Sequence, residues 1–413
     1  MTNSIHPVLR IALIGLLVFI VLLVAAGAWI ATHATIDIAK PSGPHPVGFT
    51  STTLTDPARG RVITLDTWYP ASTTQGTSPE PYTEKALADL LSKYQHIPAI
   101  GSEVASLSFR DAPMQSGKHP VITFNHGYGS FTKQNFSNFQ ELASQGWLIV
   151  SIGHPAESLL ARDAKGAPLV FDDTSTIYKR MLQLQTQDAK AYTRNLAEAI
   201  AIQRGATDAA SFEQVSQMVA QTPPYSFLEP LASAWEQDTR FVIANLDRVP
   251  GADGSQVVMM GHSLGGMVTL ALAKNPPAGV RAAINLDGPW VRYGNDSAQL
   301  KVPVLIMLST ENVFGGDNLS LAGTFDPLLR VHSTGAYVVE IAGTAHFNFT
   351  DLSYAPIMRY LSPVIGSVDA TDMINWQRDT LAEFLRRVQT GDLQVSPLLA
   401  QNPKINQRFF PVR

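Results

Sequence analysis

A serine with one glycine two residues before it and another two residues after it has the pattern of a nucleophile held on a tight turn. The sequence GHSLG at residues 261–265 follows the apolar run 257–260 and opens a helical pattern that ends near residue 275. In such a strand–turn–helix the serine backbone is strained, and side chains two residues before and after it would clash. Glycine at both positions removes that clash. We therefore predict Ser263 to be a nucleophile at a helix N-terminus, where developing negative charge is stabilised.

A second glycine-containing turn follows another apolar run. Residues 121–125 (VITFN) lead directly into HGYG. In folds with a nucleophile on a strand–helix turn, this position supplies one of two backbone N–H groups that bind the oxyanion. We assign these donors to the backbone amides of Tyr128 and Leu264, the latter directly after the serine. His126 in this turn, and His154 after the next strand pattern, are expected to form local hydrogen bonds.

His346 is the expected general base because it follows the last strand pattern, residues 336–341. In this kind of fold the chain order is serine, then acid, then histidine. His332 precedes that strand and would lie on the wrong side. The remaining histidines precede the serine; only His262 is adjacent to it, and we expect its ring to face away.

Two carboxylates could orient that histidine. Asp287 ends the strand pattern 282–287, and Glu311 follows the pattern 302–308. Both would lie at the carboxyl edge of the sheet, where ligands bind. The acid must hold the imidazole tautomer and stabilise the imidazolium. A short, buried aspartate does so with fewer rotamers to freeze, so the residues favour Asp287 and leave Glu311 open.

Strand-like and helix-like patterns alternate along most of the chain. Several strand patterns are almost continuously apolar, as expected for parallel strands covered on both faces. This alternation predicts an α/β fold, with a mostly parallel central sheet and helices on both faces. An edge strand is expected before the first pattern. The strand patterns lie at 62–69, 121–125, 147–152, 257–260, 282–287, 302–308 and 336–341, and helical patterns at 136–145, 235–246, 264–274 and 376–388.

Residues 172–234 interrupt this alternation. They are helix-rich, break at Pro223-Pro224, and fall between the fourth predicted strand and the helix that leads to the fifth. Such an excursion from a sheet is often a cap over an active site. A helical insertion without a role in the chemistry is the alternative.

The N-terminal run at residues 11–30 (IALIGLLVFIVLLVAAGAWI) carries no charge. At this length a helix is about 30 Å long, which matches the hydrocarbon core of a bilayer. Arg10 precedes the run and Trp29 lies near its far end, which favours a transmembrane helix. A cleaved signal peptide is the alternative, and both place the catalytic part outside the cytoplasm. The predicted organisation is a membrane anchor or signal segment (1–31), a tether (32–50) and a catalytic domain (51–413).

Composition excludes several other classes of protein. The 413 residues carry 34 acidic and 30 basic side chains, and no block rich in Lys or Arg appears, so nucleic acid is not an expected partner. The absence of cysteine excludes disulfides, thiolate metal sites and a cysteine nucleophile. No His/Asp/Glu cluster has ligand spacing, so we expect neither a metal nor another cofactor. The oligomeric state stays open.

These motifs together resemble the platelet-activating factor acetylhydrolases of the plasma and intracellular type II kind, also called lipoprotein-associated phospholipases. A His-x-Asn-Phe-x-Asp pattern after the last strand is the most telling part, since it is unusual among hydrolases at large. The resemblance covers most of residues 60–350, in the segments DTWYPA, ITFNHGYGSF, GWLIVSIGH, WEQDTRFVIANL, MGHSLGG, NLDGPW and GTAHFNFTDLSY.

The resemblance implies an α/β-hydrolase fold in which the acid follows the sixth strand, hence Asp287. It implies Ca²⁺-independent hydrolysis of short or oxidised acyl chains at the second position of glycerophospholipids. The expected partners are thus an ester or phospholipid substrate, and a membrane through the N-terminal helix. A general esterase, lipase or polyester hydrolase is the first alternative, and a catalytically silent binding protein on the same scaffold is the second.

Overall fold

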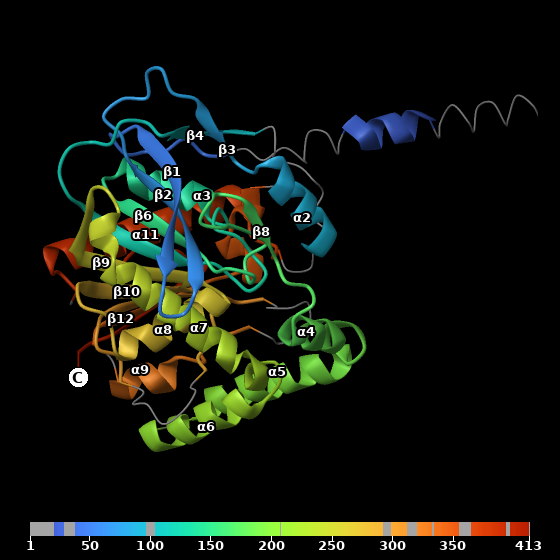
Figure 1. Ribbon diagram of the computed structural model, residues 1–413. Helices are drawn as coiled ribbons and strands as arrows, with labels where there is room; N and C mark the ends of the chain where they lie inside the picture. Colours follow the sequence, from blue (N-terminus) through green and yellow to red (C-terminus); the bar gives the residue numbers. More distant parts are fainter. Residues whose placement is uncertain are drawn as a thin grey trace, which may run out of the picture.

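A central eleven-stranded sheet organises the computed structural model of the protein (Figure 1). The structure describes residues 20–28, 38–95, 104–206, 208–291, 299–311, 320–332, 334–354, 365–393 and 397–412. Across the sheet the strands are β13 (Ile405–Phe410), β12 (Ala336–Ile341), β11 (Val304–Ser309), β10 (Val280–Leu286), β9 (Ala252–His262), β5 (His119–Asn125), β6 (Leu148–Gly153), β2 (Arg61–Pro70), β1 (Val47–Asp56), β4 (Ala105–Arg110) and β3 (Pro79–Pro81).

The middle of the sheet is parallel, from β12 through β11, β10, β9 and β5 to β6. Every residue of β6, β11 and β12 is buried, as their apolar sequences predicted. All seven predicted strand patterns lie in this sheet, and β1 is the expected strand before the first of them. It is not an edge strand as expected, because β4 and β3 extend the sheet beyond it. The antiparallel edge strand β13 was not predicted, because three of the six residues in its sequence INQRFF are polar and only Ile405 is fully buried.

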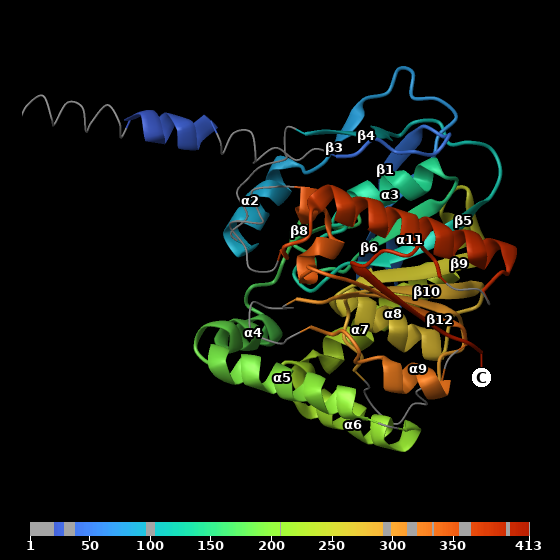
Figure 2. The same cartoon turned by 180° about the vertical axis from the view of Figure 1, so that it is seen from behind.

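Helices cover both faces of the sheet (Figure 2). The aromatic core under α3 is built on Trp68, which packs edge-on against Phe49 and Phe136. On the opposite face Trp235 is fully buried. One face carries α3 (Phe136–Ser144) and α11 (Ala370–Thr390), and the other carries α7 (Tyr225–Ala244), α8 (Leu264–Lys274) and α9 (Asp326–His332).

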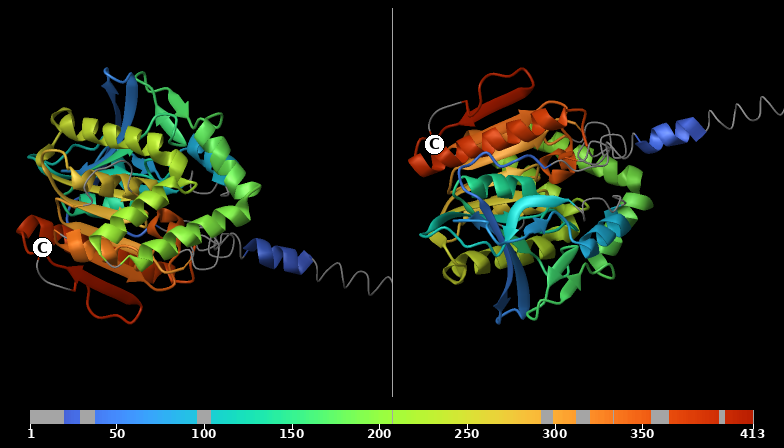
Figure 3. Two further views of the ribbon diagram at one scale, coloured as in Figure 1. Left: turned by 90° about the horizontal axis from the view of Figure 1, so that it is seen from below. Right: turned by 90° about the horizontal axis from the view of Figure 1, so that it is seen from above.

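The interval predicted as a helical insertion contains three helices and the start of α7. These green helices lie together on one side of the sheet (Figures 1 and 3). α5 buries Tyr192, Leu196 and Ile200, whereas α4 buries no residue completely. The cap consists of α4 (Thr176–Thr186), α5 (Ala189–Gly205), α6 (Ala209–Gln221) and the part of α7 up to residue 234. The other short elements are α2 (Lys85–Gln95), β7 (Leu160–Arg162), β8 (Pro168–Val170), η1 (Leu246–Arg248), η2 (His346–Phe349) and η3 (Asp351–Tyr354).

The folded domain begins earlier than the predicted boundary at residue 51. β1 starts at Val47, within the predicted tether 32–50, and pairs along its whole length with β2. Before it, the backbone N–H of Ser42 donates to Glu141 of α3 at 2.9 Å. The sequence predicts a tether here because its Pro, Gly and His residues show no periodicity, whereas contacts with a distant helix hold the described residues 42–45 in place.

The predicted transmembrane run 11–30 lies mostly outside the described residues. Its residues 20–28 form a helix whose side chains are exposed. In the parts of the chain that the structure describes, no helix has both the length and the apolar character needed to cross a bilayer.

Candidate active site

Ser263 occupies the turn between β9 and α8 and has a strained backbone. Its φ of 56° and ψ of −121° lie where non-glycine residues are rare. Two hydrogen bonds hold the turn: the N–H of Ser263 donates to the carbonyl of Leu286 at 3.0 Å, and the N–H of Met267 donates to the carbonyl of Ser263 at 3.0 Å. The predicted strand–turn–helix is therefore present, with the serine at a helix N-terminus.

Glycines around this turn allow close approaches that a side chain would block. A Cβ on Gly261 would overlap the backbone of Gly265, and one on Gly265 would overlap the backbone of Asn125. A Cβ on Gly266 would overlap the side chain of Asn285 on the next strand. These clashes are the physical reason for the G-x-S-x-G-G pattern.

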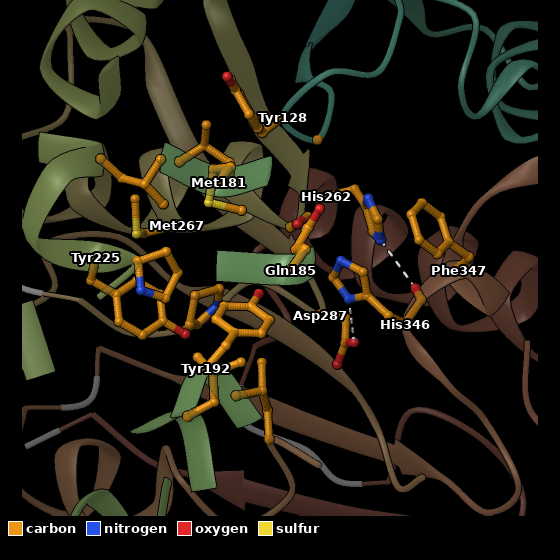
Figure 4. A pocket seen from close by; sticks show the side chains of 18 of the residues that line it. Tyr128, Met181, Gln185, Tyr192, Tyr225, His262, Met267, Asp287, His346 and Phe347 are labelled. Atoms are coloured by element: carbon orange, nitrogen blue, oxygen red, sulfur yellow. Dashed lines mark hydrogen bonds and ion pairs between the residues drawn. The ribbon is translucent and has the colours of Figure 1, made fainter. Parts of the chain in front are cut away.

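Asp287 and His346 meet at the carboxyl edge of the sheet (Figure 4). Nδ1 of His346 donates to Oδ2 of Asp287 at 2.8 Å, and the aspartate is fully buried. Asp287 also accepts from the backbone N–H of Ser309 at 2.8 Å and from its hydroxyl at 2.9 Å. Together these bonds fix the carboxylate and select the Nδ1–H tautomer of His346.

Ser309 was not singled out in the sequence. It ends β11, the strand directly beside β10, so parallel pairing brings it to the carboxylate that follows β10. A polar residue at the end of an otherwise apolar strand was the available signal.

Glu311, the alternative acid, is not brought to His346. It is exposed, and it accepts hydrogen bonds from the backbone N–H of Ser367 at 3.2 Å and from its hydroxyl at 2.8 Å. The structure therefore pairs the histidine with Asp287, as the residues favoured.

The turn at residues 126–129 passes directly beside the serine. A Cβ built on Gly127 would lie 3.3 Å from Cβ of Ser263. The backbone N–H of Gly127 donates to Oε1 of Gln134 at 3.0 Å, which holds the turn. Tyr128 and Leu264, the predicted oxyanion donors, both line the cavity into which Ser263 opens.

The prediction that the His262 ring faces away was wrong. This ring lines the same cavity, with its centroid 4.6 Å from that of His346 (Figure 4). Its Nε2–H donates to the carbonyl of His346 at 3.1 Å. Burial, together with the neighbouring His346, holds the pKa of His262 well below its usual range, so the ring is a neutral donor. The direction of the ring depends on the turn geometry, which strand alternation does not specify.

His126 forms a local hydrogen bond in its own turn, as predicted, whereas His154 bonds to a residue 84 positions away and the prediction of a local bond was wrong for it. Nδ1 of His126 donates to the carbonyl of Gly127 at 2.7 Å, and the hydroxyl of Ser158 donates to Nε2 at 2.6 Å. Burial lowers the pKa of His126 to about 3, so this ring stays neutral. Nδ1 of His154 donates to Asp238 at 2.9 Å.

The cavity over Ser263 has a volume of about 430 Å³ and is walled on one side by the cap. Its cap lining is apolar and aromatic with a few neutral polar groups, from α4, α5 and α7 (Figure 4). Among the described residues, no group of three His, Asp or Glu side chains could hold a metal ion. The cap residues at the cavity include Met181, Gln185, Tyr192, Thr193, Leu196 and Tyr225.

A mostly parallel sheet with helices on both faces, a strained serine after one of its strands and a His–Asp pair at the same sheet edge define the α/β-hydrolase class. The sequence also matches the family "Platelet-activating factor acetylhydrolase, isoform II" over residues 30–395. Because this match spans most of the chain, the protein belongs to that family. Family membership and the serine on its strand–helix turn together place it among the carboxylic ester hydrolases.

Individual relatives agree with this membership. The platelet-activating factor acetylhydrolase of Gallus gallus is 24% identical over 373 residues, which cover 85% of this chain and 83% of the relative. That of Cavia porcellus is 27% identical over 277 residues, 64% of this chain, and the match spans only 57% of the relative. The solved ferulic acid esterase from Streptomyces cinnamoneus superposes with a TM-score of 0.62 over 90% of this chain and 98% of its own. At 20% identity that likeness shows the fold.

Proposed function

We propose that Ser263, His346 and Asp287 form a catalytic triad that hydrolyses carboxylic esters through an acyl-enzyme. Nε2 of His346 removes the hydroxyl proton as Oγ of Ser263 attacks the ester carbonyl, and then gives this proton to the leaving alcohol. Water repeats the sequence on the acyl-serine and releases the acid. The observation that carries this proposal is the 2.8 Å bond from His346 to Asp287 beside the strained serine.

The backbone amides of Tyr128 and Leu264 would bind the oxyanion of the tetrahedral intermediate. Both flank Ser263 at the cavity, and Leu264 opens α8, whose dipole favours negative charge there. The first test is labelling of the full chain with a fluorophosphonate, which reacts with an activated serine. We expect the label on Ser263, and an unlabelled, hydrolytically inactive protein would support the silent binding protein instead.

The substrate we propose is a phospholipid with a short or oxidised acyl chain at the second glycerol position. Family membership supports this class, and the cap closes one side of the cavity, which limits acyl length. Each extra buried CH₂ gains roughly 0.8 kcal/mol where there is room, but overpacking costs about 1–3 kcal/mol. We therefore expect kcat/KM to peak between acetyl and hexanoyl esters and to fall steeply for palmitoyl.

A chain-length series on glycerophosphocholine esters, run beside simple alcohol esters of the same acids, tests this substrate. Peak activity at long chains would contradict the proposal and favour a lipase. Equal kcat/KM on the simple esters would favour a general esterase or polyester hydrolase. Addition of a calcium chelator is expected to change nothing, because the proposed steps use only side chains and backbone amides.

We further propose that residues 11–30 anchor the catalytic domain to a membrane from outside the cytoplasm. The support is the length of the uncharged run and the position of Arg10 before it. The mature protein is then expected to sediment with membranes and to resist carbonate extraction. A soluble product that begins at Trp29, cut after Ala28, would show a signal peptide instead.

A further inference from the structure

The His-x-Asn-Phe-x-Asp pattern that begins at His346 has a polar residue at each of two further positions. Asn348 serves the loop itself: its Oδ1 accepts from the backbone N–H of Ala345 at 2.7 Å and from that of Gly366 at 2.7 Å. These bonds tie the residue before His346 to a segment that follows in the sequence. The other polar residue, Asp351, reaches a different element.

Asp351 binds the buried N-terminus of α3, more than 200 residues earlier in the chain. Its Oδ2 accepts from the backbone N–H of Ser137 at 3.0 Å, and its Oδ1 accepts from the Ser137 hydroxyl. Asn135, the N-cap residue of α3, makes no capping hydrogen bond with its own side chain. A carboxylate here satisfies a free helix N–H and is stabilised by the helix dipole, so Asp351 caps α3 from outside.

Two further bonds join the same pair of segments. The backbone N–H of Asp351 donates to the carbonyl of Gln134 at 3.1 Å, and Nδ2 of Asn135 donates to the carbonyl of Phe349 at 2.6 Å. The side chain of Gln134 also accepts from the N–H of Gly127 in the oxyanion turn. The segment before α3 is therefore hydrogen-bonded on one side to the oxyanion turn and on the other to the loop that carries His346.

The carboxyl of Asp351 is an unfavourable choice for stability alone. Among the described residues, the donors that face this carboxyl are neutral: they are Ser137 and Tyr82, which directly follows β3. Tyr354 of η3 lies nearby and is also neutral. Arg378 on α11, a cation close to Tyr354, binds Glu141 at 2.7 Å. Burial without a cationic partner raises the pKa of Asp351 to about 7. A buried acid of this kind costs stability unless another requirement retains it.

We propose that Asp351 is a positioning residue, which docks the His346 loop on α3 and thereby fixes the general base relative to the oxyanion turn. This inference rests on the proposed triad. A base that is misplaced by about 1 Å can lose on the order of 10²-fold in rate, although no contact to substrate is removed. The expected defect is therefore in the chemical step and not in substrate binding.

The test compares D351N, S137A and their double variant in the full chain, on a short-chain ester. Asparagine keeps the shape of Asp351 but loses its charge and one acceptor. We expect kcat to fall on the order of 10- to 100-fold in D351N, with KM changed less than about threefold. The double variant is expected to be no slower than D351N, because both substitutions remove the same contact.

Asp208, whose side chain caps α6 by accepting from the N–H of Ser211 at 2.8 Å, provides the matched control. D208A removes a helix cap on an element that does not line the cavity, so it should lower Tm without changing kcat. A D351N enzyme with kcat within about twofold of wild type would overturn the proposal, as would an equal kcat loss in D208A at the same Tm.

If D351N does not fold, S137A decides. This variant removes only a hydroxyl and is expected to lose at least about threefold in kcat, so unchanged turnover would overturn the proposal. Failure of the triad itself is distinguishable, because wild-type protein would then neither hydrolyse esters nor take up a fluorophosphonate at Ser263.

Discussion

Two buried histidine–aspartate pairs lie in the part of the chain that the structure describes, and their distances are almost the same. Nδ1 of His346 lies 2.8 Å from Asp287, and Nδ1 of His154 lies 2.9 Å from Asp238. Each histidine follows a parallel strand of the central sheet, β12 and β6 respectively. Distance and burial alone would assign both pairs to catalysis, so the difference between them lies in what surrounds each pair.

In the pair of His154 and Asp238, both side chains are held by further contacts within the core. Nε2 of His154 lies 3.1 Å from Oδ1 of Asn125, and its ring stacks on Trp235 at 3.9 Å with an interplanar angle of 9°. Asp238 forms ion pairs with Arg59 and Arg61, both at 2.8 Å. Burial opposes ionisation of Asp238, but hydrogen bonds from His154 and Arg61 outweigh it and lower its pKa to about 2.

The first pair keeps what catalysis needs. Besides His346, Asp287 accepts only from the neutral backbone and hydroxyl of Ser309 among the described hydrogen bonds, so its charge is available to a developing imidazolium. His346 lines the same cavity as Ser263. A histidine–aspartate pair thus indicates catalysis only when its imidazole faces a cavity and its carboxylate is not already neutralised by arginines.

The largest effect is expected when Ser263, which lines the same cavity as His346, is replaced. S263A should lose roughly 10⁴-fold or more in ester hydrolysis while keeping its fold, because the nucleophile is gone. Ser158 is the control, because its hydroxyl also donates to a buried histidine, His126, at 2.6 Å. S158A should retain most of the turnover. Initial rates on a short-chain ester measure the turnover of both variants. A slow S158A together with an active S263A would show that Ser263 is not the nucleophile.

The acids give the next effect. D287N should lower kcat on the order of 10³- to 10⁴-fold, because the amide favours the wrong tautomer of His346. E311Q should lose far less, since Glu311 is exposed and bonds to Ser367. Steady-state kinetics of the two variants decide this, and the opposite ranking would place the acid after β11.

Substitution of Asp238 should lower stability strongly and activity only slightly, the opposite of what is expected for Asp287. D238N leaves two arginines beside a buried site, and breaking a buried ion pair in this way costs about 3–5 kcal/mol. Among molecules that still fold, kcat should fall less than tenfold. Urea unfolding and kinetics on the same preparation measure the two effects, and a stable but inactive D238N would show that this pair takes part in the chemistry.

Asp351 is a third buried acid, and the effect expected from it is the smallest, a change with pH. Its pKa rises from 3.8, the usual value for an aspartate, to about 7 in the folded protein. Between those pH values the folded protein holds a proton that the unfolded chain has lost, so the free energy of unfolding falls as pH rises from about 4 to about 7. D351N cannot ionise and should lack this slope.

Urea titrations of wild type and D351N at several pH values measure that difference. The stability of wild type relative to D351N should decline up to about pH 7 and then level off. A difference that stays constant, or grows with pH, would show that the carboxyl of Asp351 is ionised throughout and that burial does not govern it.

The sequence by itself determined the features that depend on neighbours along the chain. Ser263 could be predicted because the glycines that its tight turn requires stand only two positions away on either side, at 261 and 265, although the backbone that Gly265 must clear belongs to the distant Asn125. The parallel strands could be predicted because burial on both faces leaves a continuous apolar run. His346 followed from chain order and its place after the last strand.

Tertiary structure alone decided the contacts between distant segments. The choice of Asp287 over Glu311 depends on how β10 and β12, which lie on either side of β11, place residues 59 positions apart. The His262 ring enters the cavity because the base loop packs against the turn. The docking of Asp351 on α3 spans 214 positions and leaves no periodic trace. Hydrogen bonds act over about 3 Å, so they depend on the final placement of elements, whereas hydrophobic patterning records only which side of each element is buried.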